Sequence, residues 1–221
     1  MTSDAGPATP NRLQRRKQRT RAALIRAAQA FIAAGKTNAP ILEITKAADV
    51  GMGSFYNHFE TKDELFAAAV ADVLDAQGAL LDQITEALDD PAEAFACRFR
   101  LCGRLFRRQP QEARIMMSNG LSLLSSDRGL APRARRDIIA AAEAGRFTVA
   151  DPDVALAIAG GALLGLGQLL LDQPDRDDAT TTDAATVEVL RLFGVTAEEA
   201  RRLCSRPMPD VVLVGDAGSA A

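Results

Sequence analysis

Apolar residues recur every three or four positions along most of the chain, which is the pattern of amphipathic helices. The first such face predicts a helix that begins near Thr20 and ends at Gly35, a C-terminal breaker. Its buried positions would be Leu24, Ala27, Ala28 and Phe31. Pro40 suits the first turn of a second helix, where its missing N–H would be unpaired anyway. The inner face of that helix would comprise Ile41, Ile44, Ala47 and Ala48.

Residues 49–51 interrupt the pattern, which resumes from Met52 to His58 as a short third helix. Thr61 and Glu64 have the spacing of a capping box and open a long fourth helix that ends before Pro91. The apolar stripe of this helix is predicted to be Leu65, Phe66, Ala69, Val70, Val73 and Leu74. Later helices are expected at Ala92–Arg108, Gln111–Leu124, Pro132–Ala144, Pro152–Leu171, Ala184–Phe193 and Ala197–Cys204.

Composition agrees with a globular, all-α fold. Of the 221 residues, 48% are hydrophobic but only 5% are aromatic, and tryptophan is absent. Such a balance favours closely packed helices over sheets, which prefer β-branched and aromatic residues. The chain is long enough for one or two domains.

The stretch from Val154 to Leu171 carries no charge and approaches the length of a membrane-spanning helix. However, both flanks are acidic, no Lys or Arg bias orients it, and its many Gly and Ala residues make it only modestly hydrophobic. We therefore interpret it as a buried helix. Since the N-terminus has no apolar signal core, the expected location is the cytoplasm.

Charge is divided unevenly along the chain. Residues 1–62 hold ten Lys and Arg against four Asp and Glu, whereas the remainder holds sixteen against twenty-five. A basic head on an acidic body suggests that only the head meets a polyanion such as nucleic acid.

No enzyme motif emerges. His58 is the only histidine, so a multi-histidine metal site cannot form, and we expect neither a metal nor another cofactor nor catalytic residues. The three cysteines, which contain no CxxC pair, behave by default as small buried hydrophobes, with thiol-based redox sensing by Cys97 and Cys102 as the alternative.

Two short helices joined by a tight turn and preceded by a supporting helix form the helix-turn-helix arrangement. The segment from Ile41 to Val70 closely resembles the signature of the TetR (tetracycline-repressor) family of transcriptional regulators. The matching positions are Ile44, Ala48, Val50, Gly53, Phe55, Tyr56, His58, Phe59, Lys62 and Leu65. The resemblance is strong over residues 20–70, and beyond them it covers only the plan of a helical body. The sequence departs from the family signature at four positions: Ala39, Thr45, Asp49 and Gly51.

The resemblance implies a role for each matched position. Tyr56, His58 and Lys62 would contact phosphates, while Met52, Ser54 and Asn57 would face base edges. Phe55 and Phe59 would pack inward. The basic run from Arg12 to Arg21, including Arg16 and Arg19, is by default a solvated arm, but beside this motif it is a candidate for phosphate contact.

The resemblance also implies the architecture: an N-terminal three-helix helix-turn-helix domain, followed by a helical bundle for ligand binding and dimerisation. We expect a disordered basic arm at residues 1–18, the DNA-binding domain at 19–62, the regulatory domain at 63–206 and a flexible tail at 207–221. The glycine-rich helix over residues 154–171 and the one over 184–193 would form the dimer interface, with an internal core helix as the alternative.

The implied function is DNA-binding regulation, as a homodimeric repressor released from a palindromic operator by a small, largely apolar effector. The effector would meet Phe95, Phe99, Leu101, Met116, Met117 and Leu121, although these residues could simply fill the core. Two other classes stay open: a helical ligand-binding or scaffolding protein without DNA binding, and an enzyme on a helical scaffold. Steep loss of DNA affinity with rising salt would separate the first of these from a DNA binder.

Overall fold

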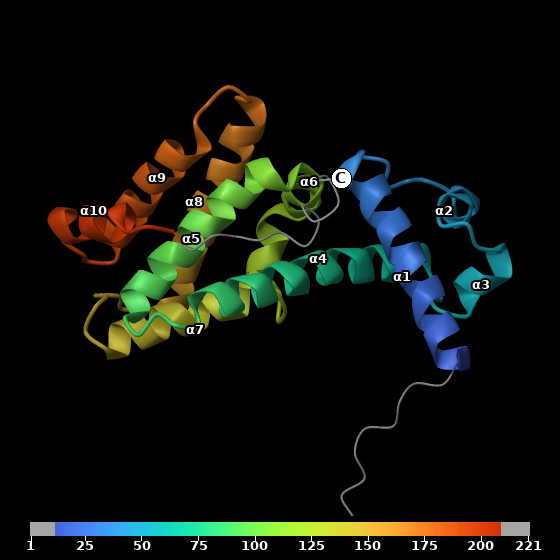
Figure 1. Cartoon of the computed structure of the whole chain (residues 1–221), viewed down its shortest axis with the longest axis horizontal. Coiled ribbons are helices and arrows are strands. Elements are labelled where there is room, and N and C mark those ends of the chain that lie inside the picture. The colour runs from blue at the N-terminus through green and yellow to red at the C-terminus, as the bar shows by residue number, and fades with distance from the viewer. Residues whose placement is uncertain (1–11, 209–221) are drawn as a thin grey trace, which may run out of the picture. The chain divides into compact units, whose positions relative to one another are not determined.

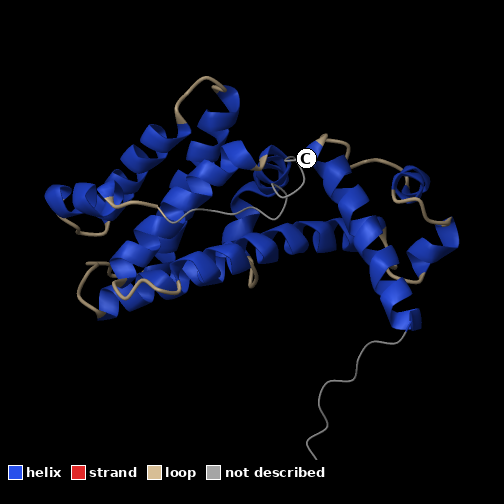
Figure 2. Cartoon of the chain, in the orientation of Figure 1, coloured by secondary structure: helices blue, strands red, loops and turns tan. Residues whose placement is uncertain are grey.

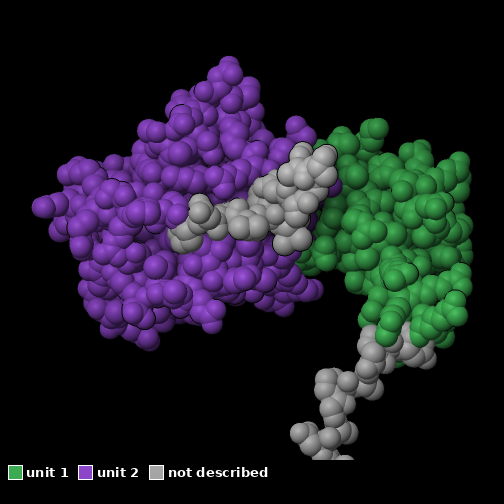
Figure 3. Space-filling model, viewed as in Figure 1, with its two compact units in different colours: residues 1–72 green, residues 73–221 purple. Residues whose placement is uncertain are grey.

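The computed structural model describes residues 12–208, and within them every regular element is a helix (Figure 2). The chain divides into two compact units after Asp72 (Figure 3). This division lies within α4, so one helix belongs to both units. Residues 1–11 of the predicted arm and residues 209–221 of the predicted tail lie outside the described residues.

The first unit contains α1 (Arg12–Ala33), α2 (Ile41–Ala47), α3 (Met52–Tyr56) and the start of α4 (Lys62–Thr85). Its core includes Leu24, Ala28, Ile44, Phe55 and Leu65, all fully buried. The predicted inner face of α2 is wrong at Ala47, which is exposed, while Thr45 is buried instead. The Thr45 hydroxyl tolerates burial because it donates to the Leu42 carbonyl at 3.1 Å.

α1 begins at Arg12, earlier than the predicted start at Thr20. The predicted disorder of residues 1–18 is therefore wrong for residues 12–18, which are helical. The basic run lacks an apolar stripe, but Arg, Gln and Lys are good helix formers. The Thr61 capping box is present, with the Glu64 amide donating to the Thr61 hydroxyl at 3.1 Å. The Glu64 carboxylate in turn accepts from the Glu60 amide at 2.7 Å.

The second unit consists of the rest of α4 and seven further helices (Figure 1). They are α5 (Pro91–Arg108), α6 (Pro110–Asn119), the 3-10 helix η1 (Gly120–Ser125), α7 (Leu130–Glu143), α8 (Pro152–Asp172), α9 (Asp178–Leu192) and α10 (Ala197–Ser205). α5 is the central helix and packs against α6, α7, α8, α9 and α10.

Two predicted elements differ from the structure. The expected helix Gln111–Leu124 breaks at Gly120, whose φ of +51° suits glycine, and continues as η1. α9 begins at Asp178, earlier than the predicted Ala184, because Asp177 caps it by accepting from the Thr180 amide at 2.6 Å. Its polar first turns concealed it, although Thr182 and Thr186 are both fully buried.

α8 is long and apolar enough to cross a membrane by length and composition, and 33% of that stretch is buried inside the chain. Core helices pass the same test, so this is weak evidence for a membrane span. Leu156, Leu166 and Leu170 are buried within the second unit.

Candidate nucleic-acid interface and effector cavity

The turn between α2 and α3 is built by Asp49, the only non-glycine residue with positive φ (54°) among residues 12–208. Asp tolerates this left-handed conformation better than most residues do. The Val50 amide donates to the Thr45 carbonyl at 3.0 Å, which closes the end of α2. Gly51 then precedes α3 without a side-chain cap, in an extended conformation (φ −70°, ψ 151°) open to any residue.

Two aromatic side chains fix α3 on the first unit. Phe55 and Phe59 are 0% and 2% exposed, with ring centroids 6.1 Å apart, which confirms the prediction that both pack inward. Because they bury one side of the α3 segment, its other side faces solvent. Met52 is 40% exposed and Tyr56 60%, and Asn57 is also exposed, whereas Ser54 is half-buried. Of the residues predicted to face base edges, Met52 and Ser54 therefore lie on a short, firmly anchored helix, and Asn57 follows as its C-cap.

A basic cluster lies beside the end of α3. His58 is half-buried, and its pKa is lowered by burial and then by the nearby positive charges of Lys17 and Arg21 on α1. The Arg21 guanidinium lies over the Phe59 ring, 5.2 Å from its centroid. The sequence reading missed Lys17 and Arg21 as neighbours of His58, because only the packing of α1 brings them there.

The other candidate phosphate contacts lie at the starts of two helices. Lys62 begins α4 and is half-buried, with its ammonium 5.8 Å from the Phe66 ring centroid. Arg16 and Arg19 are exposed on α1 and line one open hollow with Arg12 and Arg15. This arrangement places several positive charges along the outer surface of the first unit, as phosphate binding requires.

The second unit contains a partly open apolar cavity of about 90 Å³. α4, α5, α6, η1, α7 and α8 all contribute to its wall. Three of the residues predicted to meet the effector line it: Phe95, Phe99 and Met116. Leu101, Met117 and Leu121 do not; Leu101 is buried in a cluster with Leu81 and Cys97, and Leu121 is 67% exposed.

The break at Gly120 explains the position of Leu121. An uninterrupted helix would have continued the face that carries Met116 and Met117. In η1 it is Leu123 and Leu124 that line the cavity instead. Leu124 packs against the backbone of α8 at Gly160, where a Cβ would overlap it. Periodicity alone could not find these two residues, because the 3-10 helix changes the direction of every side chain after the break.

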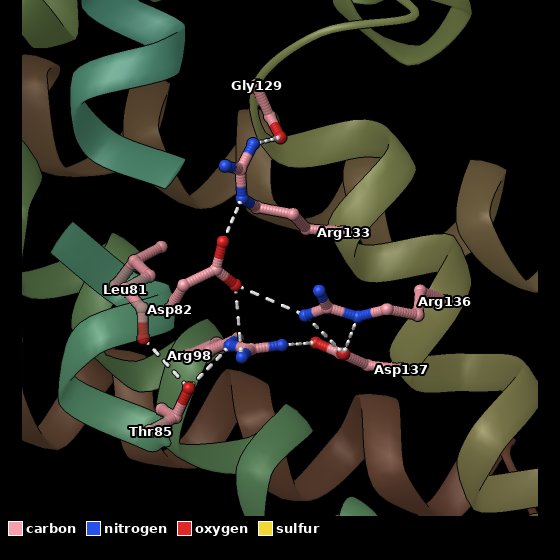
Figure 4. Close-up of polar contacts among 8 residues, drawn as sticks. All are labelled: Leu81, Asp82, Thr85, Arg98, Gly129, Arg133, Arg136 and Asp137. Atoms are coloured by element: carbon pink, nitrogen blue, oxygen red, sulfur yellow. Dashed lines mark hydrogen bonds and ion pairs between the residues drawn. The ribbon is translucent and has the colours of Figure 1, made fainter. Parts of the chain in front are cut away.

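One wall of the cavity is charged, because Arg98, Arg133 and Asp137 line it. Figure 4 shows the polar contacts that these residues make. Arg98 on α5 pairs with Asp137 on α7 and, through its second Nη, with Asp82 on α4 at 3.2 Å. Its Nε donates to the Thr85 hydroxyl at 2.8 Å. Asp82 also accepts from Arg133 Nε at 2.5 Å and from Arg136 Nη2 at 3.2 Å. Three helices are thereby joined through a network of ions that are buried or half-buried, apart from the exposed Arg136.

This charged wall separates two environments. Arg98 and Asp137 line both the apolar cavity and a neighbouring open polar cleft. Partial burial tends to raise the pKa of the Asp82 carboxyl, but hydrogen bonds from Arg133 and Arg136 outweigh it and hold the pKa below its ordinary value. Asp82 therefore remains ionised at neutral pH and keeps the positive charges of Arg98, Arg133 and Arg136 paired.

The sequence reading missed the charged wall, although a signal was present. Arg98 falls between Phe95, Phe99 and Cys102 at helical spacing, so it is a charge on a buried stripe. A buried charge needs a partner of opposite sign. Asp82 and Asp137 carry the same signal on their own helices, yet nothing in the spacing says that the three helices meet.

The cysteines lie in the second unit and are unpaired. Cys102 lines the cavity, and burial raises its pKa to about 12; burial likewise raises the pKa of Cys204 to about 11. All three thiols thus remain protonated at neutral pH. Protonated thiols are poor nucleophiles, which favours packing over thiol chemistry.

Among residues 12–208, nothing covers an apolar surface formed by α8 and α9. Val154 is 56% exposed and Ile158 41%, and both Gly161 and Gly165 face open space. These four positions follow one another at helical spacing on α8. On α9, Leu192 is 67% exposed. Gly160 and Gly167 instead pack inward against Leu124 and Phe106, so the glycines of α8 serve two different faces.

Comparisons with known proteins agree with this architecture. Residues 24–69 match the family described as bacterial regulatory proteins, tetR family, and residues 90–206 match the tetracyclin repressor-like C-terminal domain. The crystal structure of RolR without ligand is 38% identical, covers 86% of this chain and 99% of RolR, and has a TM-score of 0.70. The comparison with curated protein sequences gave no match.

RolR in complex with resorcinol is 35% identical over 89% of this chain and 98% of RolR, with a TM-score of 0.63. The fatty acid degradation regulator FadR from Bacillus halodurans shares the fold, with 18% identity, coverage of 79% and 94%, and a TM-score of 0.62. The match to both family domains and the identity to RolR carry the same conclusion. This chain belongs to the TetR family of transcriptional regulators, which bind DNA through the helix-turn-helix.

Proposed function

We propose that this regulator is a cytoplasmic, homodimeric repressor that leaves a palindromic operator when a small aromatic compound with hydroxyl groups enters its second unit. The observation that carries this proposal is the cavity, which combines apolar walls with one charged wall. A planar ring suits contacts with Phe95, Phe99 and Leu124, while hydroxyl groups suit the ions of the charged wall. RolR, the 35% identical relative, was solved with resorcinol, a benzene ring with two hydroxyl groups.

Specific groups are available to such a ligand. Asp137 is an acceptor at the cavity wall with a side chain only 9% exposed, and Arg133 is a donor there at 27%. A hydroxyl group buried without a partner would lose its hydrogen bonds to water, so a charged partner gives selectivity for phenols over plain hydrocarbons.

On the DNA side, we assign Met52, Ser54 and Asn57 to base edges. Tyr56, His58, Lys62, Arg16 and Arg19 would contact phosphates. In the homodimer, the apolar stripe of α8, which includes Val154 and Gly161, would pack with α9 against the same surface of a second copy. Each copy would then cover the apolar surface of the other in an isologous interface. Two copies would then read half-sites about one helical turn, 34–36 Å, apart or a multiple of that.

α4 provides the path from ligand to DNA, because it begins at Lys62 and supplies Leu74 and Leu81 to the cavity wall. A ligand that favours one position of this helix would change the placement of Lys62. Coupling of this kind is typically worth about 1–3 kcal/mol and is reciprocal. Operator DNA must therefore weaken ligand binding by the factor by which the ligand weakens DNA binding.

Two titrations test the proposal. Operator fragments are first selected from the source genome by their retention on the wild-type protein, and resorcinol is then titrated into the protein with and without operator. We expect resorcinol affinity to fall about 5- to 150-fold in the presence of operator. Benzene serves as the ring without hydroxyl groups and should bind more weakly. Equal resorcinol affinities in the two titrations, or no binding in either, would overturn the proposed effector response.

A further inference from the structure

Gly78 lies buried in the middle of α4, where glycine is less favourable for a helix than alanine. The side chain of Arg133 from α7 explains the lack of a side chain there. A Cβ at position 78 would lie 2.6 Å from Arg133 Nη1, 2.7 Å from Cζ and 2.9 Å from Nε. Because all three atoms belong to one planar group, the guanidinium lies directly against the backbone of α4.

Two further contacts hold this guanidinium in place (Figure 4). Its Nε donates to Asp82 Oδ2 at 2.5 Å, one turn further along α4, and its Nη1 donates to the Gly129 carbonyl at 2.7 Å. Nη2 has no partner among residues 12–208, although Arg133 lines the cavity. A guanidinium has five donor hydrogens in a fixed plane, so fixing two of its nitrogens also fixes the direction of the third.

The Gly129 contact links the same arginine to α4 a second time. Gly129 has φ +76°, and a Cβ there would lie 2.5 Å from the Cβ of Leu74, which itself lines the cavity. Arg133 thus holds the loop after η1 against α4 while its own plane lies on Gly78. A shift of this guanidinium would act on α4 at Leu74, Gly78 and Asp82 together.

We infer that Gly78 is a positioning residue, which seats the Arg133 guanidinium on α4 so that a cavity ligand bound through Nη2 acts on that helix directly. This deepens the proposed function and rests on it for the identity of the ligand. A methyl group at position 78 moves the guanidinium off the helix and weakens its bonds to Asp82 or Gly129. The Nη2 donor then no longer points in the direction that the ligand requires.

Resorcinol affinity in a double-mutant cycle tests the positioning role. Gly78→Ala should weaken resorcinol binding about tenfold or more in the wild-type background, which is the effect expected from one lost charged hydrogen bond. In the Arg133→Ala background the same substitution should change the remaining affinity less than twofold, because the displaced group is gone. Ala79→Gly, at the exposed neighbouring position, controls for altered helix propensity and should leave the affinity within twofold.

Thermal unfolding gives a readout that needs no ligand. Gly78→Ala should lower the Tm of the wild-type protein, because the methyl group overlaps the guanidinium. It should raise the Tm of Arg133→Ala, because alanine favours the helix. Ala79→Gly should lower the Tm in both backgrounds alike.

The two measurements separate the possible failures. Absence of resorcinol binding by the wild type overturns the proposed effector class. A Gly78→Ala change that lowers the Tm of the wild type but raises that of Arg133→Ala would still support the placement of the Arg133 guanidinium against Gly78. If the wild type binds resorcinol but Gly78→Ala binds it equally well, the positioning role is wrong and the effector class stands. If Gly78→Ala changes the Tm in the same direction in both backgrounds, the contact between the Arg133 guanidinium and Gly78 is not what position 78 provides.

Discussion

The α3 helix of the first unit and the cavity of the second unit present their polar groups in opposite ways. On α3, Tyr56 and Asn57 are exposed, and a single local turn at Asp49 together with the buried Phe55 is enough to present them. At the cavity, Arg98 and Asp137 have side chains only 15% and 9% exposed and come from helices distant in sequence. The first site is local and lies at the surface, whereas the second exists only when several helices have packed.

Because of this difference, ligand binding and folding stability depend on the same residues at the cavity, whereas on α3 the residues proposed to bind DNA contribute little to stability. A solvated side chain on α3 can be replaced with little effect on folding, because water satisfies its neighbours. A charge removed from the cavity wall leaves its partner buried without compensation, which is costly. We therefore expect substitutions on α3 that change the preferred DNA sequence to leave folding intact. Substitutions at the cavity wall that change the ligand should leave folding intact only when both members of an ion pair are replaced together.

The largest effect is expected for Arg98→Met. This change leaves Asp137 buried with only the 3.1 Å contacts from Arg136, so the free energy of unfolding should fall by about 3 kcal/mol. Urea unfolding at fixed protein concentration measures it. The double variant Arg98→Met/Asp137→Leu should recover most of the loss. Arg135→Met, which breaks only the exposed pair with Asp153, is the control and should leave the free energy of unfolding almost unchanged.

Base readout should give the next largest effect. Asn57→Ala should reduce affinity for the preferred operator by about 1–3 kcal/mol and flatten the preference at one base pair. If Tyr56 contacts a phosphate, as proposed, Tyr56→Phe should instead weaken binding equally on every sequence. Binding curves on the operator and its base-substituted variants distinguish the two, with unfolding free energy as the control for both. A uniform loss for Asn57→Ala would reassign that residue to the backbone.

The same contrast explains how much could be predicted from the sequence. The α3 region was predictable because its structure is determined locally: Phe55 and Phe59 were expected inward and both are buried. Phe95, Phe99 and Met116, which were predicted to meet an effector, line the cavity, since apolar periodicity identifies a helix face. Asp82, Arg98 and Asp137 were missed because their pairing depends on which helices meet. Leu123 and Leu124 were missed because η1 departs from helical periodicity.

Acid should weaken the second unit through its paired carboxylates. Burial tends to raise the pKa of Asp82 and of Asp90, but hydrogen bonds to Arg133 and Arg136, and to Arg146, hold both values below normal. A depressed pKa in the folded state stabilises the protein above the unfolded pKa of about 4, and this contribution is lost as the pH falls through the folded value.

Tm measured from pH 7 to pH 3 should therefore decline below about pH 4. Asp82→Asn cannot titrate, so its Tm should be lower at pH 7 and decline less steeply. Because the Asp82 side chain is 34% exposed, solvent screening keeps this effect smaller than that of Arg98→Met. Parallel Tm curves for wild type and Asp82→Asn would show that Asp82 has an ordinary pKa in the folded protein.

The smallest effect is expected at the start of α3, where Gly51→Ser should stabilise the helix. Gly51 has extended backbone angles that suit serine, and a Cβ there would meet nothing within 4 Å, so the change introduces no strain. A serine hydroxyl at this N-cap can accept from the Ser54 amide, which now donates only to the Gly51 carbonyl at 2.9 Å. Since glycine is itself a fair N-cap, the gain should be a few tenths of a kcal/mol, equivalent to a Tm increase of roughly 1–2 °C. Gly51→Ala is the matched control, because it adds the same Cβ without the hydroxyl and should lower the Tm. If alanine stabilises α3 as much as serine does, the gain comes from the reduced freedom of the unfolded chain, and the missing cap has no energetic consequence.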